Sequence, residues 1–371
     1  MKITVQHEEL ASRMGVAARV AMSKGSNLAL GGVQVHASAD GVELRATNIE
    51  MGLRNPLLAT VVTEGTVLLP AKLLQDVVKS LPKGEVTLEH QPATQDVLVS
   101  SGSSQFTLRT LRNEDFPTLA APEEAKSWTI DAEALSETVA QVIRSASRDE
   151  SRPLLTGVLV SVSTAEGVLR MVATDSYRLA IKTTHLESTP EEDFSAVIPA
   201  RTLEEVVRIS QGEKAEVVKV GSNQGQIIFI MGDTQLTSRL IDGKFPDHNQ
   251  LVPKEFEHTL VFDRSELLQR VERISLLAQQ STPIRFALST KGLKLSAQAA
   301  EVGEAVETVD VTWTSEELET GFNPQYLIEG LKSNSCKQVK LKLINALKPG
   351  LIESADESGF QYLIMPVRLG L

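Results

Sequence analysis

The stretch that decides the fold occurs three times, as VLLPAKLLQDVV at residues 67–78, AVIPARTLEEVV at 196–207 and GFNPQYLIEGL at 321–331. In each copy an apolar run meets a proline and then continues with apolar residues at helical spacing. Proline is tolerated in the first turn of a helix, where its missing N–H would have no partner. The copies recur at intervals of about 125 residues, whereas solenoid and propeller repeats recur every 20–50 or so. The repeated unit is therefore a whole domain.

A second amphipathic helix precedes that stretch in every copy. Its apolar residues follow the spacing i, i+4, i+7, i+11, which gives one apolar stripe. These residues are Leu10, Met14, Ala17 and Ala21; Leu135, Val139, Val142 and Ala146; and Leu267, Val271, Ile274 and Ala278. We expect helices over residues 7–24, 71–83, 131–148, 200–210, 263–278 and 324–333.

Short alternating strands surround these helices and predict an α+β fold. Each third contains two helices and about eight strands in the order β-α-β-β-β, twice, which predicts helices on one face of antiparallel sheets. Charged stretches with proline interrupt the strand pattern near residues 121–127 and 253–258. We therefore expect three similar domains, at residues 1–126, 127–255 and 256–371.

The net charge of −11 argues at first against a nucleic-acid partner. The acidity is uneven, however. The six expected helices together carry +2, which leaves −13 for the strands and loops. This contrast permits a basic helical face on an acidic body.

The sequence offers little support for catalysis or for a cofactor. Phosphate-loop and dinucleotide-binding glycine motifs are absent, and His7-Glu8 lacks the second histidine that a zinc protease motif requires. The single cysteine, Cys336, allows no intrachain disulfide and fits a reducing compartment. With no membrane-length apolar run and no secretory signal in the sequence, we expect a cytoplasmic protein that binds no metal and no membrane.

The copies differ in two places that suggest a binding surface. The second copy has TDSYRL at residues 174–179 after a strand, and the chain closes with the apolar run YLIMPVRL at 362–369. One interpretation is a last core strand. The other is a hydrophobic pocket, bounded by Leu155, Leu179, Pro246 and the terminal run, that takes a short peptide.

These residues belong to a set of motifs that resembles the bacterial beta sliding clamps, the processivity factors of DNA polymerase III. The motifs are RPLLTG at 152–157, ATDSYRLA at 173–180, LIDGKFPD at 240–247, FNPQY at 322–326 and the run at 362–369. The resemblance covers essentially the whole chain. It implies three clamp domains per subunit and a head-to-tail homodimer whose six domains form a ring around double-stranded DNA. The ring would bind DNA of any sequence and would have no catalytic activity. It also implies a place with the nucleoid.

The resemblance further implies a set of functional residues. The implied partners of the peptide pocket are the alpha subunit of the replicative polymerase, the clamp loader, and repair and translesion polymerases. The pocket falls on Leu155, Thr174, Ser176, Arg178, Leu179, Pro246, Leu251, Asn323, Tyr326, Leu347, Leu363, Met365, Pro366, Val367 and Arg368. The residues expected near DNA are Lys24, Arg148 and Arg152, and the subunit interface is expected to pair Phe106 with Leu276 and Leu277.

Two other function classes stay open from the residues alone. One is an enzyme with an unrecognised site, which stoichiometric binding of a nucleotide or metal would reveal. The other is an adhesion-type multidomain β protein, against which the missing signal peptide and disulfides count. The chain also departs from the clamp pattern at Gln250, in a short segment at Gln279–Pro283 and in the extension Gly370–Leu371.

Overall fold

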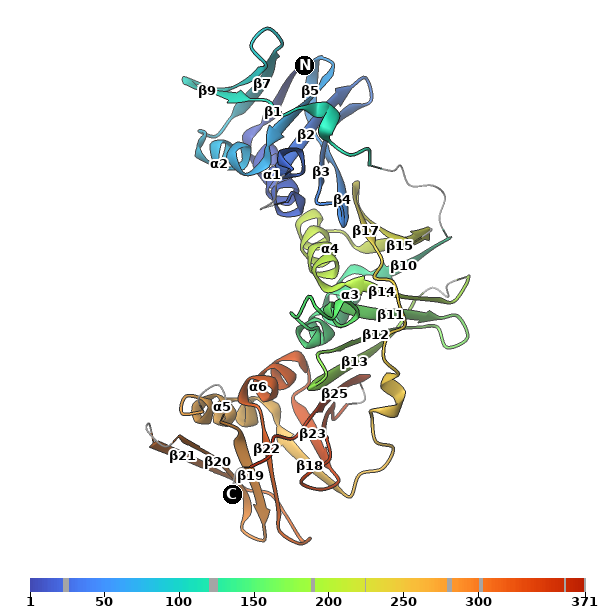
Figure 1. The fold of residues 1–371 in the computed structure, drawn as a ribbon, viewed down its shortest axis with the longest axis vertical. Coiled ribbons are helices and arrows are strands. Elements are labelled where there is room, and N and C mark those ends of the chain that lie inside the picture. The colour runs from blue at the N-terminus through green and yellow to red at the C-terminus, as the bar shows by residue number, and fades with distance from the viewer. Residues whose placement is uncertain are drawn as a thin grey trace. The chain divides into compact units, whose positions relative to one another are not determined.

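The computed structural model describes residues 1–22, 27–119, 126–187, 191–223, 225–278, 282–299, 303–356 and 358–369 (Figure 1). The first third contains β1(Lys2–Gln6), α1(His7–Val20), η1(Leu28–Gly31), β2(Gly32–Ser38), β3(Gly41–Thr47), β4(Met51–Leu57), β5(Ala59–Thr63), β6(Gly65–Pro70), α2(Ala71–Ser80), β7(Glu85–Gln91), β8(Asp96–Ser101), β9(Ser104–Arg109) and η2(Asn113–Asp115). The second contains β10(Lys126–Asp131), α3(Ala132–Val142), η3(Ile143–Ser145), η4(Pro153–Thr156), β11(Gly157–Ser163), β12(Val168–Thr174), β13(Arg178–His185), β14(Phe194–Pro199), α4(Ala200–Glu213), β15(Val217–Asn223), β16(Gln226–Met231), β17(Thr234–Arg239) and η5(His248–Gln250). The third contains β18(His258–Asp263), α5(Arg264–Ser275), β19(Ile284–Ser289), β20(Gly292–Ala299), β21(Gly303–Val309), β22(Leu318–Phe322), α6(Pro324–Ser333), β23(Gln338–Leu343), β24(Gly350–Ser354) and β25(Phe360–Ile364).

All six helices expected from the sequence are present, but four of them end early; among these, α5 stops at Ser275 instead of residue 278. Helix α1 stops at Val20 instead of residue 24, and α2 stops at Ser80 because Leu81 precedes a proline and takes an extended conformation. Helix α3 ends at Val142 and continues as the tighter turn η3, which still buries Ser145. The expected end of this helix at residue 148 was therefore wrong. No helix in the described part of the chain is long and apolar enough to cross a membrane.

The chain forms two compact units, and the central third is divided between them. The first unit comprises residues 1–132 and 201–240, and the second comprises residues 133–200 and 241–371. Helix α4 and strands β10 and β15–β17 thus belong with the first third, whereas α3 and β11–β14 belong with the last.

Each unit contains one eight-stranded sheet that combines strands from two neighbouring thirds of the chain. In the first unit the strand order is β10-β15-β16-β17-β4-β3-β2-β6, and Leu236 of β17 pairs with Leu53 of β4. In the second unit the order is β14-β11-β12-β13-β25-β24-β23-β18, and Leu179 of β13 pairs with Leu363 of β25. Strands from neighbouring thirds are therefore joined by antiparallel hydrogen bonds within a single sheet. Each unit also has a smaller sheet, β5-β1-β7-β8-β9 in the first and β21-β20-β19-β22 in the second.

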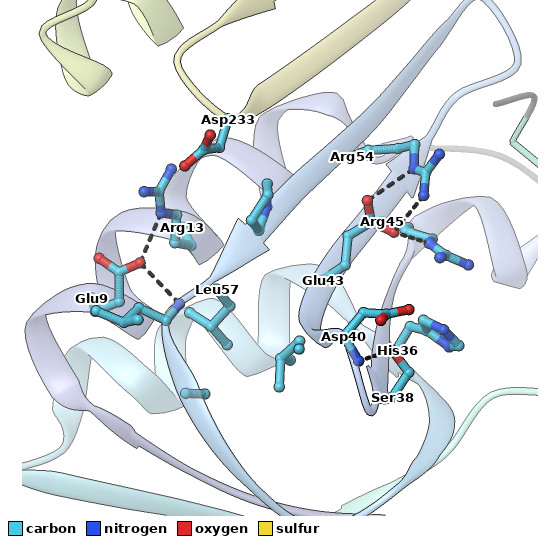
Figure 2. Close-up of a pocket in the computed structure, with 15 residues that line it drawn as sticks. Glu9, Arg13, His36, Ser38, Asp40, Glu43, Arg45, Arg54, Leu57 and Asp233 are labelled. Atoms are coloured by element: carbon cyan, nitrogen blue, oxygen red, sulfur yellow. Dashed lines mark hydrogen bonds and ion pairs between the residues drawn. The ribbon is translucent and has the colours of Figure 1, made fainter. Parts of the chain in front are cut away.

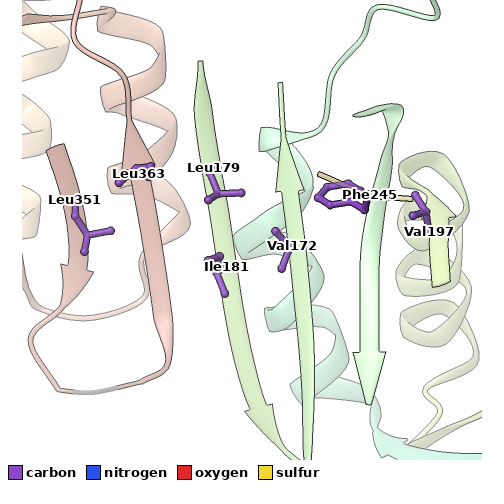
Figure 3. Close-up of a cluster of buried hydrophobic side chains, with 7 residues drawn as sticks. All are labelled: Val172, Leu179, Ile181, Val197, Phe245, Leu351 and Leu363. Atoms are coloured by element: carbon purple, nitrogen blue, oxygen red, sulfur yellow. The ribbon is translucent and has the colours of Figure 1, made fainter. Parts of the chain in front are cut away.

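The same hydrogen bond recurs at the end of every copy. The N–H of Leu111 donates to the carbonyl of Leu68, that of Ile241 to Val197, and that of Val367 to Gly321, each at 2.8 Å. In the first two copies the chain then crosses the face of the eight-stranded sheet and inserts a phenylalanine. In the second unit Phe245 joins a buried apolar cluster on that face (Figure 3), whose other members are Val172, Leu179, Ile181, Val197, Leu351 and Leu363.

The helices of each unit lie together on the face of the sheets that these segments leave free (Figure 1). In the first unit Arg19 of α1 makes an ion pair with Glu205 of α4 at 2.9 Å. In the second unit Glu137 of α3 accepts a hydrogen bond of 2.8 Å from Ser335, just after α6. Helix α5 begins as the sequence suggested, because Asp263 accepts a hydrogen bond from the N–H of Glu266 at 2.9 Å.

We predict that Gly157→Ala lowers the free energy of unfolding by about 1–3 kcal/mol, as overpacked positions typically do. A Cβ at residue 157 would lie 2.6 Å from Val197 Cγ1 and 3.0 Å from the carbonyl oxygen of Ile198. Gly212→Ala in helix α4 is the control, since a Cβ there meets nothing within 4 Å. Urea unfolding measures both, and equal stabilities for the two variants would contradict the close approach at Gly157.

Candidate functional site

The second unit contains a hollow of about 400 Å³ beside the start of helix α6. One wall comes from the chain before β19 and the first turn of α6, and the other from the turn before β13 and the segment after β25. Its lining residues are Tyr177, Thr282, Pro283, Asn323, Pro324, Tyr326, Met365, Pro366 and Val367. This volume lies within the range of small-ligand sites, and the lining is largely apolar.

A tight turn between β12 and β13 presents Tyr177 to the hollow. The hydroxyl of Thr174 donates to the carbonyl of Arg178 at 2.6 Å, and the N–H of Ser176 donates back to that hydroxyl at 3.1 Å. Asp175 accepts the N–H groups of Tyr177 and Arg178 at 2.9 and 3.0 Å. Ser176 takes a φ of 81°, which few side chains adopt, so the turn is held by these bonds and not by local preference.

The segment after β25 is held at both ends. The N–H of Met365 donates to the carbonyl of Tyr177 at 2.9 Å, and the N–H of Val367 donates to Gly321 at 2.8 Å. Pro366, between them, has no N–H to satisfy. The side chains of Met365 and Val367 are therefore presented to solvent on a fixed backbone.

Arg178 lies beneath the hollow and connects four elements of the second unit. Its guanidinium forms ion pairs with Asp175, at 3.0 Å, and with Glu329 of α6. It also donates to the carbonyl of Arg144 and lies 4.5 Å from the centre of the Tyr326 ring. An arginine can make all these contacts at once because its planar fork offers several donors.

Buried tyrosine and glutamate side chains complete this network. The hydroxyl of Tyr362 donates to the carbonyl of Tyr326 at 2.9 Å, and burial raises the pKa of Tyr362. Burial alone would raise the pKa of Glu329, but hydrogen bonds from Gln325 and Arg178 outweigh it and the pKa is lowered. Glu329 is thus a carboxylate that holds Arg178, and Arg178 supports the ring of Tyr326.

Three consecutive segments match the three domains of one protein family. Residues 1–120 match the N-terminal domain of the DNA polymerase III beta subunit, residues 129–247 its central domain and residues 249–368 its C-terminal domain. The chain belongs to the DNA polymerase III beta subunit family. The α+β fold of three clamp domains expected from the sequence is thereby confirmed.

Relatives of this clamp family match the chain over its whole length. It is 34% identical to the beta sliding clamp of Synechococcus elongatus, with 100% of both chains covered, and 28% identical to that of Bacillus subtilis, with 99% of this chain and 100% of the other covered. The solved Bacillus subtilis sliding clamp has a TM-score of 0.92 at 27% identity, with full coverage of both chains. A Pseudomonas aeruginosa sliding clamp bound to griselimycin has a TM-score of 0.91 at 30% identity, again with full coverage of both.

The structure brings five of the fifteen pocket residues expected from the clamp resemblance into the hollow itself. Those five are Asn323, Tyr326, Met365, Pro366 and Val367. Four others are buried around it: Leu155 and Thr174, together with Leu179 and Leu363 in the cluster of Figure 3. The surface holds Pro246, Leu251, Leu347 and Arg368, and Ser176 lies in the turn.

Arg178, which the clamp resemblance also assigns to the pocket, is held by groups of the protein itself. Only 9% of the residue is exposed, and its donors are already occupied by protein groups. It does not line the hollow. Within the chain, Arg178 therefore supports the ring of Tyr326, which lines the hollow.

Sequence reasoning missed the most exposed aromatic side chain of the hollow, Tyr177. It is 60% exposed, and its ring stacks near that of Tyr326, with centroids 6.5 Å apart and planes 24° apart. Tyr177 stands inside the quoted motif at residues 174–179, so the signal was present in the sequence. Thr282 and Pro283 belong to the segment at Gln279–Pro283 where the sequence departs from the clamp pattern, and the fold brings them next to helix α6.

The basic residues expected near DNA are placed less uniformly. Arg148 is exposed, and Lys24 lies outside the described residues. Arg152 is also exposed, and its guanidinium lies 3.1 Å from Asp149 and 3.1 Å from the hydroxyl of Ser176. Arg152 is thus next to the turn that forms the hollow.

The residues expected at a subunit interface lie at exposed places in separate units. Phe106 is on β9, an edge strand of the five-stranded sheet, and is exposed. Leu276, which follows α5, is 83% exposed, and Leu277 is half-buried. Large exposed apolar side chains at a sheet edge are suited to pairing with another chain.

A polar hollow of about 500 Å³ in the first unit has a different character (Figure 2). Its charges are largely paired with one another. Glu43 accepts from both Arg45 and Arg54, and these bonds lower its pKa although burial alone would raise it. Arg13 is bound to Glu9 at 2.9 Å. Such paired side chains offer little free charge to a ligand.

We predict that Glu329→Gln destabilises the second unit by about 3 kcal/mol at pH 7, because it leaves the buried Arg178 without a charged partner. The lowered pKa of Glu329 means that its contribution is present above its ordinary value of 4.5 and is lost as pH falls through the folded value. The difference in stability between the wild type and Glu329→Gln should therefore shrink as the pH falls below about 5. Unfolding followed by the fluorescence of Trp313, in a Trp128→Phe background, measures it.

Glu304→Gln serves as the control for this prediction, since Glu304 is an exposed residue of β21. An equal effect of the two substitutions, or a difference that does not depend on pH, would show that the Arg178 network does not carry the stability.

Proposed function

We propose that this chain is a DNA sliding clamp, a homodimeric ring that encircles double-stranded DNA and tethers polymerases to it. The observation that carries the proposal is the match of all three thirds of the chain to the three domains of the DNA polymerase III beta subunit. The beta sliding clamps to which it is similar match it along their entire length. We place the domain boundaries at residues 126/127 and 255/256, close to the ends of those matches.

The charge distribution supports a topological mode of DNA binding. A ring that encloses DNA needs only weak phosphate contacts, and such contacts carry no sequence information. Exposed Arg148 is a candidate for a contact of this kind. The acidic strands and loops would discourage DNA from binding outside the ring. The chain would then work at the bacterial nucleoid in the cytoplasm, where it would slide along DNA.

Exposed apolar side chains support a peptide-binding role for the hollow beside α6. Among the described residues of the second unit, eight large apolar side chains are exposed, and three of them line this hollow: Tyr177, Met365 and Val367. Apolar side chains gathered in this way mark interaction sites. We propose that the polymerase alpha subunit, the clamp loader and repair or translesion polymerases each insert apolar anchors here, and that the chain itself catalyses no reaction.

We predict that Met365→Asp, alone or with Leu347→Asp, shortens primer extension by a cognate polymerase at least tenfold on loaded circular DNA. A carboxylate beside Tyr326 would have to be desolvated by the incoming apolar anchor. Leu58→Asp, at an exposed residue of the first unit, is the control and should leave extension unchanged. Full-length products with the Met365 variants would rule out this pocket.

We predict that Phe106→Asp weakens subunit association by about 100-fold, as loss of a central aromatic contact does in other interfaces. The matched control is Val62→Asp, because β5 and β9 are the two edges of the same sheet and both residues are exposed. Sedimentation at micromolar concentration should show monomers for the first variant and dimers for the second. Dimers in both would remove Phe106 from the interface.

A further inference from the structure

The first unit holds an apolar hollow of about 550 Å³ between the end of helix α1 and the start of helix α2. Small side chains form its floor, namely Ala18, Ala21, Gly31 and Ala71. Leu28 stands at its rim with 73% of the residue exposed. Among the described residues, this apolar space and the large apolar side chain beside it are left without a covering partner, which is a feature typical of interaction sites.

One wall of this hollow repeats a wall of the peptide pocket proposed in the second unit. Pro70 and Asn323 are the N-cap residues of α2 and α6, and each lines its hollow. Leu111 and Val367 also line their hollows, and each donates its N–H to the residue two positions before that N-cap. The internal repeat has thus placed the same backbone framework at both sites.

The opposite walls differ. In the second unit Tyr177, Met365 and Pro366 close the pocket. In the first unit the end of α1 closes it, with Ala18, Ala21 and Met22. The first hollow therefore lacks an aromatic wall and should hold an apolar side chain less tightly than the second.

The charges around the first hollow favour an acidic occupant. Lys72 is the one charged residue among the described residues that line it, in a chain with a net charge of −11. Asn323 caps α6 by accepting hydrogen bonds from the N–H groups of its first turn. Pro70 has no side-chain acceptor, so the N–H groups in the first turn of α2 can bind an anion. At the end of α1, by contrast, the carbonyl of Ala17 is satisfied by the N–H of Ala21. Asp76 pairs with Lys72 at 3.0 Å, but both side chains are exposed and such a pair is weak.

We propose that this hollow is a second peptide-docking site, which takes an extended partner segment with one large apolar side chain followed by an acidic residue. The apolar side chain fills the space between Ala18 and Ala71, and the carboxylate lies between Lys72 and the first turn of α2. The choice of a peptide as the occupant rests on the function proposed for the second unit. Each clamp subunit would then offer two docking sites of unequal strength.

The test uses the full-length chain and a synthetic hexapeptide, Ser-Leu-Asp-Leu-Phe-Asp, in isothermal titration. The wild type should bind two peptides per chain, with affinities at least tenfold apart. Met365→Asp should remove the tighter site and keep the weaker one. In that background Leu28→Asp should weaken the remaining site at least tenfold, and Lys72→Gln should weaken it about threefold and reduce its salt dependence.

Two further variants separate binding from folding. Gly31→Trp should fill the hollow and abolish the weaker site, because in the described part of the chain the one atom within 4 Å of a Cβ at residue 31 is the carbonyl oxygen of Met22, at 3.4 Å. Leu58→Asp lies elsewhere in the first unit and should change neither site. Circular dichroism melting of each variant reports its folding.

The outcomes distinguish this inference from the proposed function. If folded Met365→Asp binds no peptide, the second site does not exist, while the pocket in the second unit stands. If Met365→Asp keeps both affinities, the pocket in the second unit is wrong instead. If Leu28→Asp and Gly31→Trp bind the weaker peptide as before, the hollow between α1 and α2 is not where that peptide lies.

Discussion

The antiparallel pairing of β25 with β13 is the constraint on which the site depends. It joins the last strand of the chain to a strand nearly two hundred residues earlier, with Leu363 opposite Leu179 in the register. Because β25 is fixed there, the segment after it must leave the sheet beside Tyr177, and Met365 and Val367 become the wall of a hollow. A slip of one residue in this register would turn Leu363 to the opposite face of the sheet and dismantle the buried cluster under the site.

Periodicity was sufficient to predict the fold but not the way the thirds are joined. The stripe through Leu10, Met14 and Ala17 and the prolines at the second helices gave all six helices and the triplicate plan, since both signals are local. The division of the central third between two units comes from strand pairs such as β17 with β4, which join residues far apart in sequence. No local pattern encodes such a pairing, because any alternating strand can in principle pair with any other.

The site was predictable only where a motif carried it. Residues 174–179 and 362–369 were quoted from the sequence, and both contribute to the hollow. The role of Arg178 could not be read in this way. Its four sets of partners, on α6, β25, the turn after α3 and its own turn, meet only in the folded unit. A charged residue in a binding motif looks like a ligand contact until the structure shows which groups have already taken its donors.

A sliding clamp must hold DNA by enclosing it and not by adhering to it. The most direct measurement is retention of the loaded protein on nicked circular DNA at high salt, before and after the circle is cut. Enclosure predicts stable retention on the circle, because salt weakens phosphate contacts but cannot open a closed ring. It also predicts rapid loss once the DNA has ends. Equal retention on circular and linear DNA, or loss from both as salt rises, would contradict the claim.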